Sequence, residues 1–157
     1  MSEFTENNIE KLFEGNGNLI PIKIELKESS GPVSPLYQSN LNVILTNEGN
    51  SLHLNYQYKG KYIDGVPSDQ KSIDEIIPKE KAIAILQKFL ALNPLGIERD
   101  IDEETKKKVG ISFNDLTIQI GNEKSKIRYT LKDISNSQLL SIKKIIDFIK
   151  KLNGYKY

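Results

Sequence analysis

The segment from Leu116 to Leu152 most constrains the fold, because it has the pattern of a β-hairpin that leads directly into an amphipathic helix. Apolar and polar residues alternate on both sides of a break at Gly121-Asn122-Glu123-Lys124, as in two strands with one buried face. After the second strand, and before a stop at Asn153-Gly154, apolar residues recur at helical spacing: Leu139, Ile142, Ile145, Ile146, Ile149 and Leu152. A two-stranded hairpin is marginal alone, so other strands must complete its sheet.

Three further strands are predicted in the first half of the chain. Residues 20–26, 41–45 and 52–58 each carry apolar side chains at alternate positions. A four-residue connection at Asn47-Glu48-Gly49-Asn50 joins the second of these strands to the third, which predicts an antiparallel meander. The stretch from Lys59 to Ile77 is polar and interrupted by glycine and proline, so it is predicted to be a loop.

The remaining segments predict helices. Residues 1–18 are expected to form a short N-terminal helical extension, with its apolar residues on one face. Pro78 fits the first turn of a longer helix. Its predicted buried stripe is Ala82, Ile83, Leu86, Phe89 and Leu90. The charge-rich residues 97–110 have acidic before basic side chains, which favours a solvated helical turn.

This order of elements predicts an α+β fold in one domain spanning residues 1–157. After the N-terminal helix the order is βββαββα, because strands are grouped rather than strictly alternating with helices. We expect an antiparallel sheet of about five strands with two helices packed on one face. The expected core face of the sheet comprises Ile22, Ile24, Leu41, Val43, Leu45, Leu54, Tyr56, Ile118 and Tyr129.

Charge and composition limit the classes of partner and the cellular compartments that are compatible with the sequence. The 22 Lys and Arg and 21 Asp and Glu residues leave a formal net charge of +1, which offers no basic footprint for nucleic acid. No apolar run approaches the roughly 20 residues that span a bilayer, and the acidic first residues are unlike a signal peptide. The chain has no cysteine, which fits a reducing compartment. We expect a cytoplasmic protein that binds neither nucleic acid nor membrane.

The sequence carries few groups for catalysis or cofactor binding. Its one histidine, His53, lies on the predicted solvent face of a strand and lacks the partners of a zinc site or a catalytic triad. Residues 100–104 have the alternating oxygens of a calcium loop, but Thr105 stands where that loop needs glycine. Gly15-Asn16-Gly17 lacks the Lys-Ser/Thr of a phosphate-binding loop. We therefore expect no catalytic residue, metal or cofactor.

The segment from Ser29 to Tyr37 is the predicted contact surface for a partner. Its two prolines restrict the backbone and lower the entropy lost on docking, and its apolar side chains offer contacts. The candidate partner-binding residues are Gly31, Pro32, Val33, Pro35, Leu36 and Tyr37. The alternative, a rigid connector at the sheet edge, remains open because loops with Pro and Gly are ordinary connections.

Two parts of the chain suggest a family. A strand at residues 22–26 runs into the glycine-containing turn at residues 29–33, and a late hairpin at residues 116–120 and 127–131 leads to a closing helix. This layout resembles emfourin-like proteins, which are small bacterial inhibitors of thermolysin-like metalloproteases. The resemblance implies that the loop from Ser29 to Leu36 is a contact surface.

Three functions follow as hypotheses. The leading one is a non-enzymatic protein-binding module that acts as an inhibitor or accessory factor of an enzyme such as a protease. The second is a small carboxylate-based enzyme or small-ligand-binding protein, with a cleft near residues 97–110 in which Asp100, Asp102 or Glu104 converge. The third is a homo-oligomeric structural protein, which would expose an apolar sheet face or edge.

Overall fold

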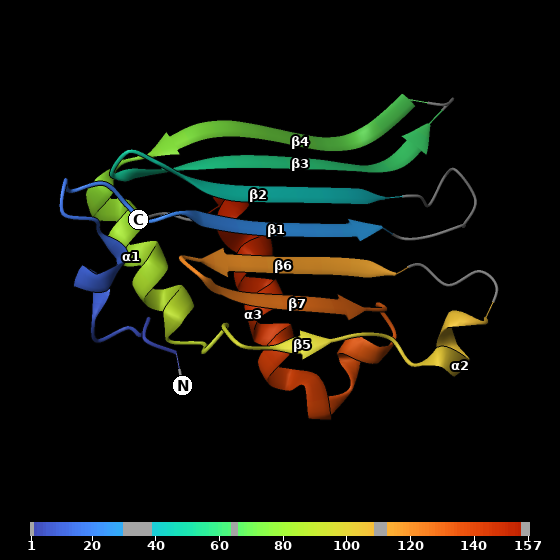
Figure 1. Ribbon diagram of the computed structural model, residues 1–157. Helices are drawn as coiled ribbons and strands as arrows, with labels where there is room; N and C mark the ends of the chain where they lie inside the picture. Colours follow the sequence, from blue (N-terminus) through green and yellow to red (C-terminus); the bar gives the residue numbers. More distant parts are fainter. Residues whose placement is uncertain (1, 30–38, 64–65, 109–112, 155–157) are drawn as a thin grey trace.

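The chain has an α+β architecture in which helices cover one face of a single sheet (Figure 1). The structure is a computed structural model, and it describes residues 2–29, 39–63, 66–108 and 113–154. The sheet has seven strands in the order β4-β3-β2-β1-β6-β7-β5. Their bounds are β1 Ile22–Ser29, β2 Asn40–Glu48, β3 Ser51–Ile63, β4 Val66–Ile77, β5 Glu98–Arg99, β6 Asn114–Ile120 and β7 Glu123–Tyr129.

Strand β1 lies near the middle of the sheet and joins its two parts. On one side, β1 to β4 form an antiparallel meander. On the other side, β1 pairs antiparallel with β6, which forms a hairpin with β7. The two-residue strand β5 adds to β7 in parallel, with Glu98 opposite Lys126. The described sheet therefore ends at β4 on one edge and at β5 on the other, at the top and bottom of Figure 1.

The helices are α1 Lys79–Leu90, α2 Glu103–Lys106 and α3 Leu140–Lys150. Helix α1 follows Pro78, as predicted, and buries Ala82, Ile85, Leu86, Phe89 and Leu90. Ile85 therefore takes the place predicted for Ile83, which is only half-buried. Helix α3 covers the predicted apolar series from Ile142 to Ile149, and it is preceded by two 3₁₀ turns at Asp133–Ser135 and Ser137–Leu139. The short N-terminal helix is also 3₁₀, at Ile9–Leu12, and it buries Leu12 in the core.

The prediction of about five antiparallel strands in the order βββαββα is wrong. The sheet has seven strands and is mixed, because β5 and β7 run parallel. Strand β4 occupies most of the stretch predicted as a loop. It carries few apolar residues, so no alternating pattern marks it, and its backbone pairs with β3 over almost its whole length. Strand β5 is too short to show any pattern, although the helical turn expected in residues 97–110 is confirmed as α2.

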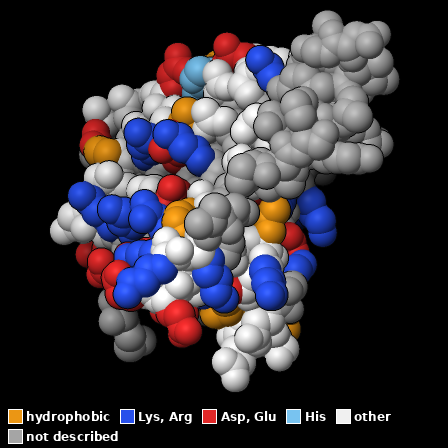
Figure 2. Space-filling view, turned by 90° about the vertical axis from the view of Figure 1, so that its right-hand side faces the viewer, with side chains coloured by type: hydrophobic (Ala, Val, Ile, Leu, Met, Phe, Trp, Pro, Cys, Tyr) orange, Lys and Arg blue, Asp and Glu red, His pale blue; other side chains and the backbone are white. Residues whose placement is uncertain are grey.

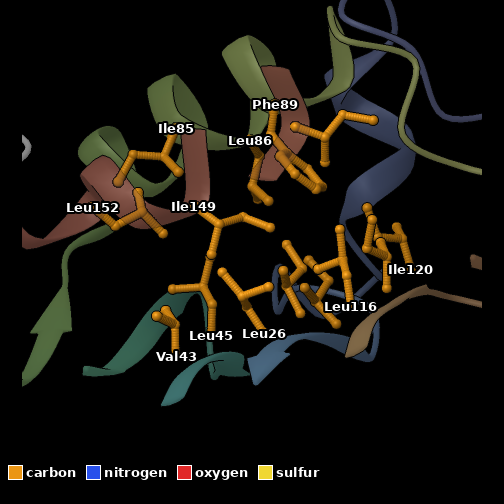
Figure 3. Close-up of a cluster of buried hydrophobic side chains, with 14 of the residues drawn as sticks. Leu26, Val43, Leu45, Ile85, Leu86, Phe89, Leu116, Ile120, Ile149 and Leu152 are labelled. Atoms are coloured by element: carbon orange, nitrogen blue, oxygen red, sulfur yellow. The ribbon is translucent and has the colours of Figure 1, made fainter. Parts of the chain in front are cut away.

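The hydrophobic core lies between the sheet and the helices α1 and α3. Figure 3 shows Leu26, Val43 and Leu45 from the sheet directed toward Ile85 and Leu86 of α1 and toward the end of α3. All nine residues predicted for the core face of the sheet are buried there: Ile22, Ile24, Leu41, Val43, Leu45, Leu54, Tyr56, Ile118 and Tyr129. The opposite face of the sheet, here called the open face, is covered by none of the described helices.

Tight turns set the register of two hairpins. Gly49-Asn50 and Gly121-Asn122 each connect paired strands through two residues, where the sequence predicted four-residue connections. Gly49 and Gly121 have φ values of 59° and 60°, which fit the first central position of a type II′ turn. Glycine reaches this conformation without the steric penalty that a Cβ atom imposes, so both turns depend on it.

Candidate functional site

The open face carries a strip of basic side chains on β1 and β7. We call Lys23, Lys27, Lys124, Lys126 and Arg128 the basic strip. Strand β6 lies between β1 and β7, and its register places Gln119 between Lys23 and Lys124 and Asp115 between Lys27 and Arg128. Figure 2 looks toward the end of the sheet where β1 ends and shows Lys and Arg side chains gathered on one flank, with Asp and Glu among them.

The acidic side chains of β1 and β6 on this face contact members of the basic strip. Arg128 donates through Nε to Asp115 Oδ1 at 3.0 Å, and Lys27 Nζ lies 3.8 Å from Glu25 Oε1. The hydrogen bond with Asp115 raises the pKa of Arg128. Within the described part of the chain, Lys23, Lys124 and Lys126 form no ion pair. Arg128 Nη1 also lies 3.9 Å from Asp100 Oδ1, and Glu98 lines a small hollow together with Lys126 and Arg128. The strip therefore has five cations, of which Lys27 and Arg128 contact the carboxylates of Glu25, Asp115 and Asp100.

A hollow of about 480 Å³ opens at the end of the sheet where β1 ends. Four of the residues that line this hollow form one row across the open face. They are Gln57 on β3, Asn42 on β2, Lys27 on β1 and Asp115 on β6, and each is the register partner of the next. We call this site the amide hollow. Its described lining residues are Lys27, Glu28, Ser29, Asn40, Leu41, Asn42, Gln57, Lys59, Phe113, Asn114 and Asp115.

A buried polar cluster lies on the helix side of the same end of the sheet. Tyr129 donates its hydroxyl to Glu28 Oε2 at 2.5 Å, and Lys150 Nζ lies 2.6 Å from Glu28 Oε1. Tyr56 donates its hydroxyl to the Lys150 carbonyl at 3.0 Å. We call these four residues the Glu28 cluster. Because Tyr129 is fully buried and the Glu28 side chain is 14% exposed, the cluster lies at the margin of the core.

The Glu28 cluster was not predicted from sequence, although one signal pointed to it. Ile22, Ile24 and Leu26 occupy the buried face of β1, and Glu28 is the next residue on that face. A carboxylate at such a position needs partners, since burial of an unpaired charge is costly. The sequence could thus have identified Glu28 as a buried acid, but not Tyr129 and Lys150 as the partners that come from β7 and α3.

Alkaline pH is expected to destabilise the fold through Tyr129. Burial, and then the hydrogen bond and charge of Glu28, raise the pKa of Tyr129 far above the ordinary tyrosine value. The folded protein therefore keeps the phenol proton at a pH where the unfolded chain, with a tyrosine pKa of about 10, releases it. The contribution of the protonated Tyr129 phenol to the free energy of unfolding is fully present below about pH 10. It is lost as the pH rises further, by up to about 1.4 kcal/mol per pH unit.

Urea unfolding at a series of pH values between about 8 and 11 measures this effect. The variant Tyr129→Phe has no proton to release at this position, so its free energy of unfolding should decline less steeply over the alkaline range. Equal slopes for the two proteins would show that Tyr129 does not cause the alkaline loss.

His53 lies on the open face, in agreement with its predicted place on the solvent side of a strand, and it is opposite Ile76 of the edge strand β4. Its Nε2 contacts the Asp74 carboxylate, and its Nδ1 lies 4.0 Å from Glu48 Oε2. The imidazole is 35% exposed and both carboxylates are more exposed still. His53 thus belongs to a surface hydrogen-bonded group rather than to an enclosed site.

The acidic residues proposed for a cleft near residues 97–110 do not converge. Asp102 caps α2 by accepting a hydrogen bond from the Thr105 backbone N–H at 2.6 Å. Asp100 accepts from Lys106 Nζ at 2.9 Å, and this bond is the largest cause that lowers the pKa of Asp100. A small hollow of about 140 Å³ is present there, and Asp100 is the one member of the trio Asp100, Asp102 and Glu104 among its described lining residues.

The predicted partner-binding residues Gly31, Pro32, Val33, Pro35, Leu36 and Tyr37 lie outside the described residues. Described residues on either side of this segment line the amide hollow. Ser29 at the end of β1 and Asn40 at the start of β2 both line the amide hollow. The hollow itself was not predicted from the sequence.

In residues 2–29, 39–63, 66–108 and 113–154, no group of three or more His, Cys, Asp or Glu side chains is placed to hold a metal ion. Over the same described ranges, no helix has both the length and the apolar character required to cross a bilayer. In the comparisons with known proteins, no family model, curated protein or solved structure matches the chain.

Proposed function

We propose that this protein is a non-enzymatic binding module whose basic strip docks an acidic surface of a partner protein. The excess of cations over carboxylates along β1 and β7 is the observation that carries the proposal. Charge complementarity of this kind steers two proteins together and selects against partners of the wrong sign. The chain as a whole has a net charge of only +1, so the strip is a local feature of the open face.

The geometry of the open face also supports docking. Protein interfaces are built from extended surfaces with many hydrogen-bonding groups, and the seven strands offer such a surface. The strip residues Lys23, Lys27, Lys124 and Lys126 are exposed, so a partner reaches them without rearrangement of the sheet. The finer proposal, following the resemblance to emfourin-like proteins, is that the module acts as an inhibitor or accessory factor of an enzyme such as a protease.

Charge reversal on the strip tests the docking proposal. The triple variant Lys23→Glu, Lys124→Glu and Lys126→Glu is expected to bind poly-L-glutamate at least about tenfold more weakly than the unaltered protein, because each lost pair and each new repulsion costs a fraction of a kcal/mol to about 1 kcal/mol. Binding should also weaken with added salt, since exposed charges are screened. Biolayer interferometry with immobilised protein at about 0.05 and 0.3 M salt measures both effects.

A matched control reverses three exposed lysines away from the open face, Lys11, Lys144 and Lys151. This control has the same net charge as the strip variant, and it should bind poly-L-glutamate within about twofold of the unaltered protein. Equal loss in both triple variants would contradict a specific strip. Strip-dependent binding of duplex DNA as tight as that of poly-L-glutamate would identify a nucleic-acid surface instead and overturn the proposal of an acidic protein partner.

A further inference from the structure

Two side chains of the amide hollow have buried polar atoms without partners. Asn42 Oδ1 and Asn114 Nδ2 are both buried, and neither has a hydrogen-bond partner among the described residues. Asn114 is only 1% exposed, and its other amide atom, Oδ1, accepts from the Ser29 backbone N–H at 2.7 Å. A buried polar group that lacks a hydrogen bond costs about 1 to 3 kcal/mol. Both residues line the amide hollow, Asn42 from the open face of β2 and Asn114 from the buried face of β6, so one unpaired acceptor and one unpaired donor lie at its wall.

The charged groups of the hollow favour a negatively charged ligand. Two carboxylates, Asp115 and Glu28, contribute to its lining, but each is already paired. Asp115 accepts from Arg128, and the Glu28 carboxylate contacts Tyr129 and Lys150 on the helix side. Lys27 has only the 3.8 Å contact with Glu25, and Lys59 forms no ion pair with any described residue. The two ammonium groups are thus the charges still open to a ligand.

The size and composition of the hollow fit a short stretch of polypeptide. Its volume of about 480 Å³ lies within the range of about 300 to 1,000 Å³ of ligand-binding clefts. Carboxamides of Asn40, Asn42 and Gln57 line it, and a carboxamide matches a peptide group because it both donates and accepts hydrogen bonds. The half-buried Phe113 adds an apolar contact for the stem of a side chain.

We infer that the amide hollow binds an extended acidic peptide segment of the partner. A backbone N–H of the segment donates to Asn42 Oδ1, a backbone carbonyl accepts from Asn114 Nδ2, and a Glu or Asp carboxylate lies between Lys27 and Lys59. This inference rests on the proposed function, because it assumes that the partner of the basic strip is an acidic protein. It deepens that function by assigning peptide recognition to a site separate from Lys23, Lys124 and Lys126.

Titration with a capped hexaglutamate peptide tests the inference. In ¹⁵N-labelled protein, the side-chain NH₂ signals of Asn42, Gln57 and Asn114 should shift on binding, whereas that of the exposed Asn7, which is not among the lining residues, should not. In calorimetry, Asn42→Leu should weaken binding at least about tenfold, because it removes the unpaired acceptor and leaves the peptide N–H without a partner. The control Asn7→Leu makes the same exchange at an exposed residue away from the hollow, and it should bind within about twofold of the unaltered protein.

A second variant and a second probe keep the test decisive. Lys59→Gln removes only an exposed charge, so it should fold and still weaken binding, even if thermal melting shows that Asn42→Leu is unfolded. Free glutarate carries carboxylates without peptide groups, and it should bind at least about tenfold more weakly than the peptide. Equal binding of glutarate, or the absence of binding by millimolar peptide, would overturn peptide recognition in the hollow.

The outcomes for the two sites are separable. If Asn42→Leu and Lys59→Gln bind the peptide normally while the strip variant loses poly-L-glutamate binding, the hollow inference fails and the proposed function stands. If the hollow variants lose peptide binding while the strip variant binds poly-L-glutamate normally, the hollow binds acidic peptides but the strip is not the docking surface.

Discussion

Replacing Leu26 by alanine is expected to lower the free energy of unfolding by about 2 to 5 kcal/mol. Leu26 is fully buried in β1, with Val43 of β2 on one side and Leu116 of β6 on the other. Figure 3 shows its side chain within the cluster beneath the helices. Truncation therefore leaves a cavity where the two parts of the sheet and the helix layer meet, and a cavity enclosed on all sides collapses poorly. Urea unfolding followed by circular dichroism measures the loss.

The matched control for Leu26 is its neighbour on the same strand. Lys27 lies on the open face, so Lys27→Ala should change the free energy of unfolding by no more than about 0.5 kcal/mol. Both changes have the same effect on strand length and pairing, so their difference isolates burial. A comparable loss for the two variants would contradict the assignment of the two faces of β1.

The second large effect is expected in the Glu28 cluster. Glu28→Ala should lower the free energy of unfolding by about 1 to 3 kcal/mol, because the Tyr129 hydroxyl then remains buried without its acceptor. Lys150 is 32% exposed, so its ammonium group turns toward water and adds less to the loss. The control Glu25→Ala removes a carboxylate from the open face of the same strand and should cost no more than about 0.5 kcal/mol.

A double-mutant cycle separates the hydrogen bond from the rest of the cluster. Tyr129→Phe combined with Glu28→Ala removes both partners, so the double variant should lose less stability than the sum of the single variants, by about 0.5 to 3 kcal/mol. Chemical denaturation of the four proteins in one buffer gives this coupling energy. Strict additivity would show that the contact between Tyr129 and Glu28 does not stabilise the fold.

Element by element, prediction from sequence succeeded where burial imposes a pattern. Strands β1, β2, β3, β6 and β7 each alternate buried and less buried side chains, so their residues reveal both the strand and its core face. Helix α1 was predicted for the same reason, apart from the exchange of Ile83 for Ile85. Strand β4 was missed because its long pairing with β3 depends on backbone hydrogen bonds at a sheet edge, and these require no apolar side chains.

The candidate sites were less predictable than the fold. Lys27 and Arg128 are far apart in the sequence and become near neighbours only because β6 lies between β1 and β7. In the sequence, Asn42 is an ordinary polar residue on the solvent side of a predicted strand. The neighbouring residues in the chain do not indicate that its Oδ1 is buried without a partner. The predicted partner-binding residues Gly31 to Tyr37 remain a prediction from sequence.

The sequence by itself determined that the protein has an α+β fold, which faces of β1, β2 and α1 are buried, and that few groups for catalysis are present. These properties depend on residue type and on spacing along the chain, because an apolar side chain must leave water whatever its neighbours are. Only the tertiary structure decided the order of the strands, the parallel strand β5, the basic strip and the amide hollow. These depend on contacts between distant segments, and hydrogen bonds between backbones leave almost no trace in the choice of residues.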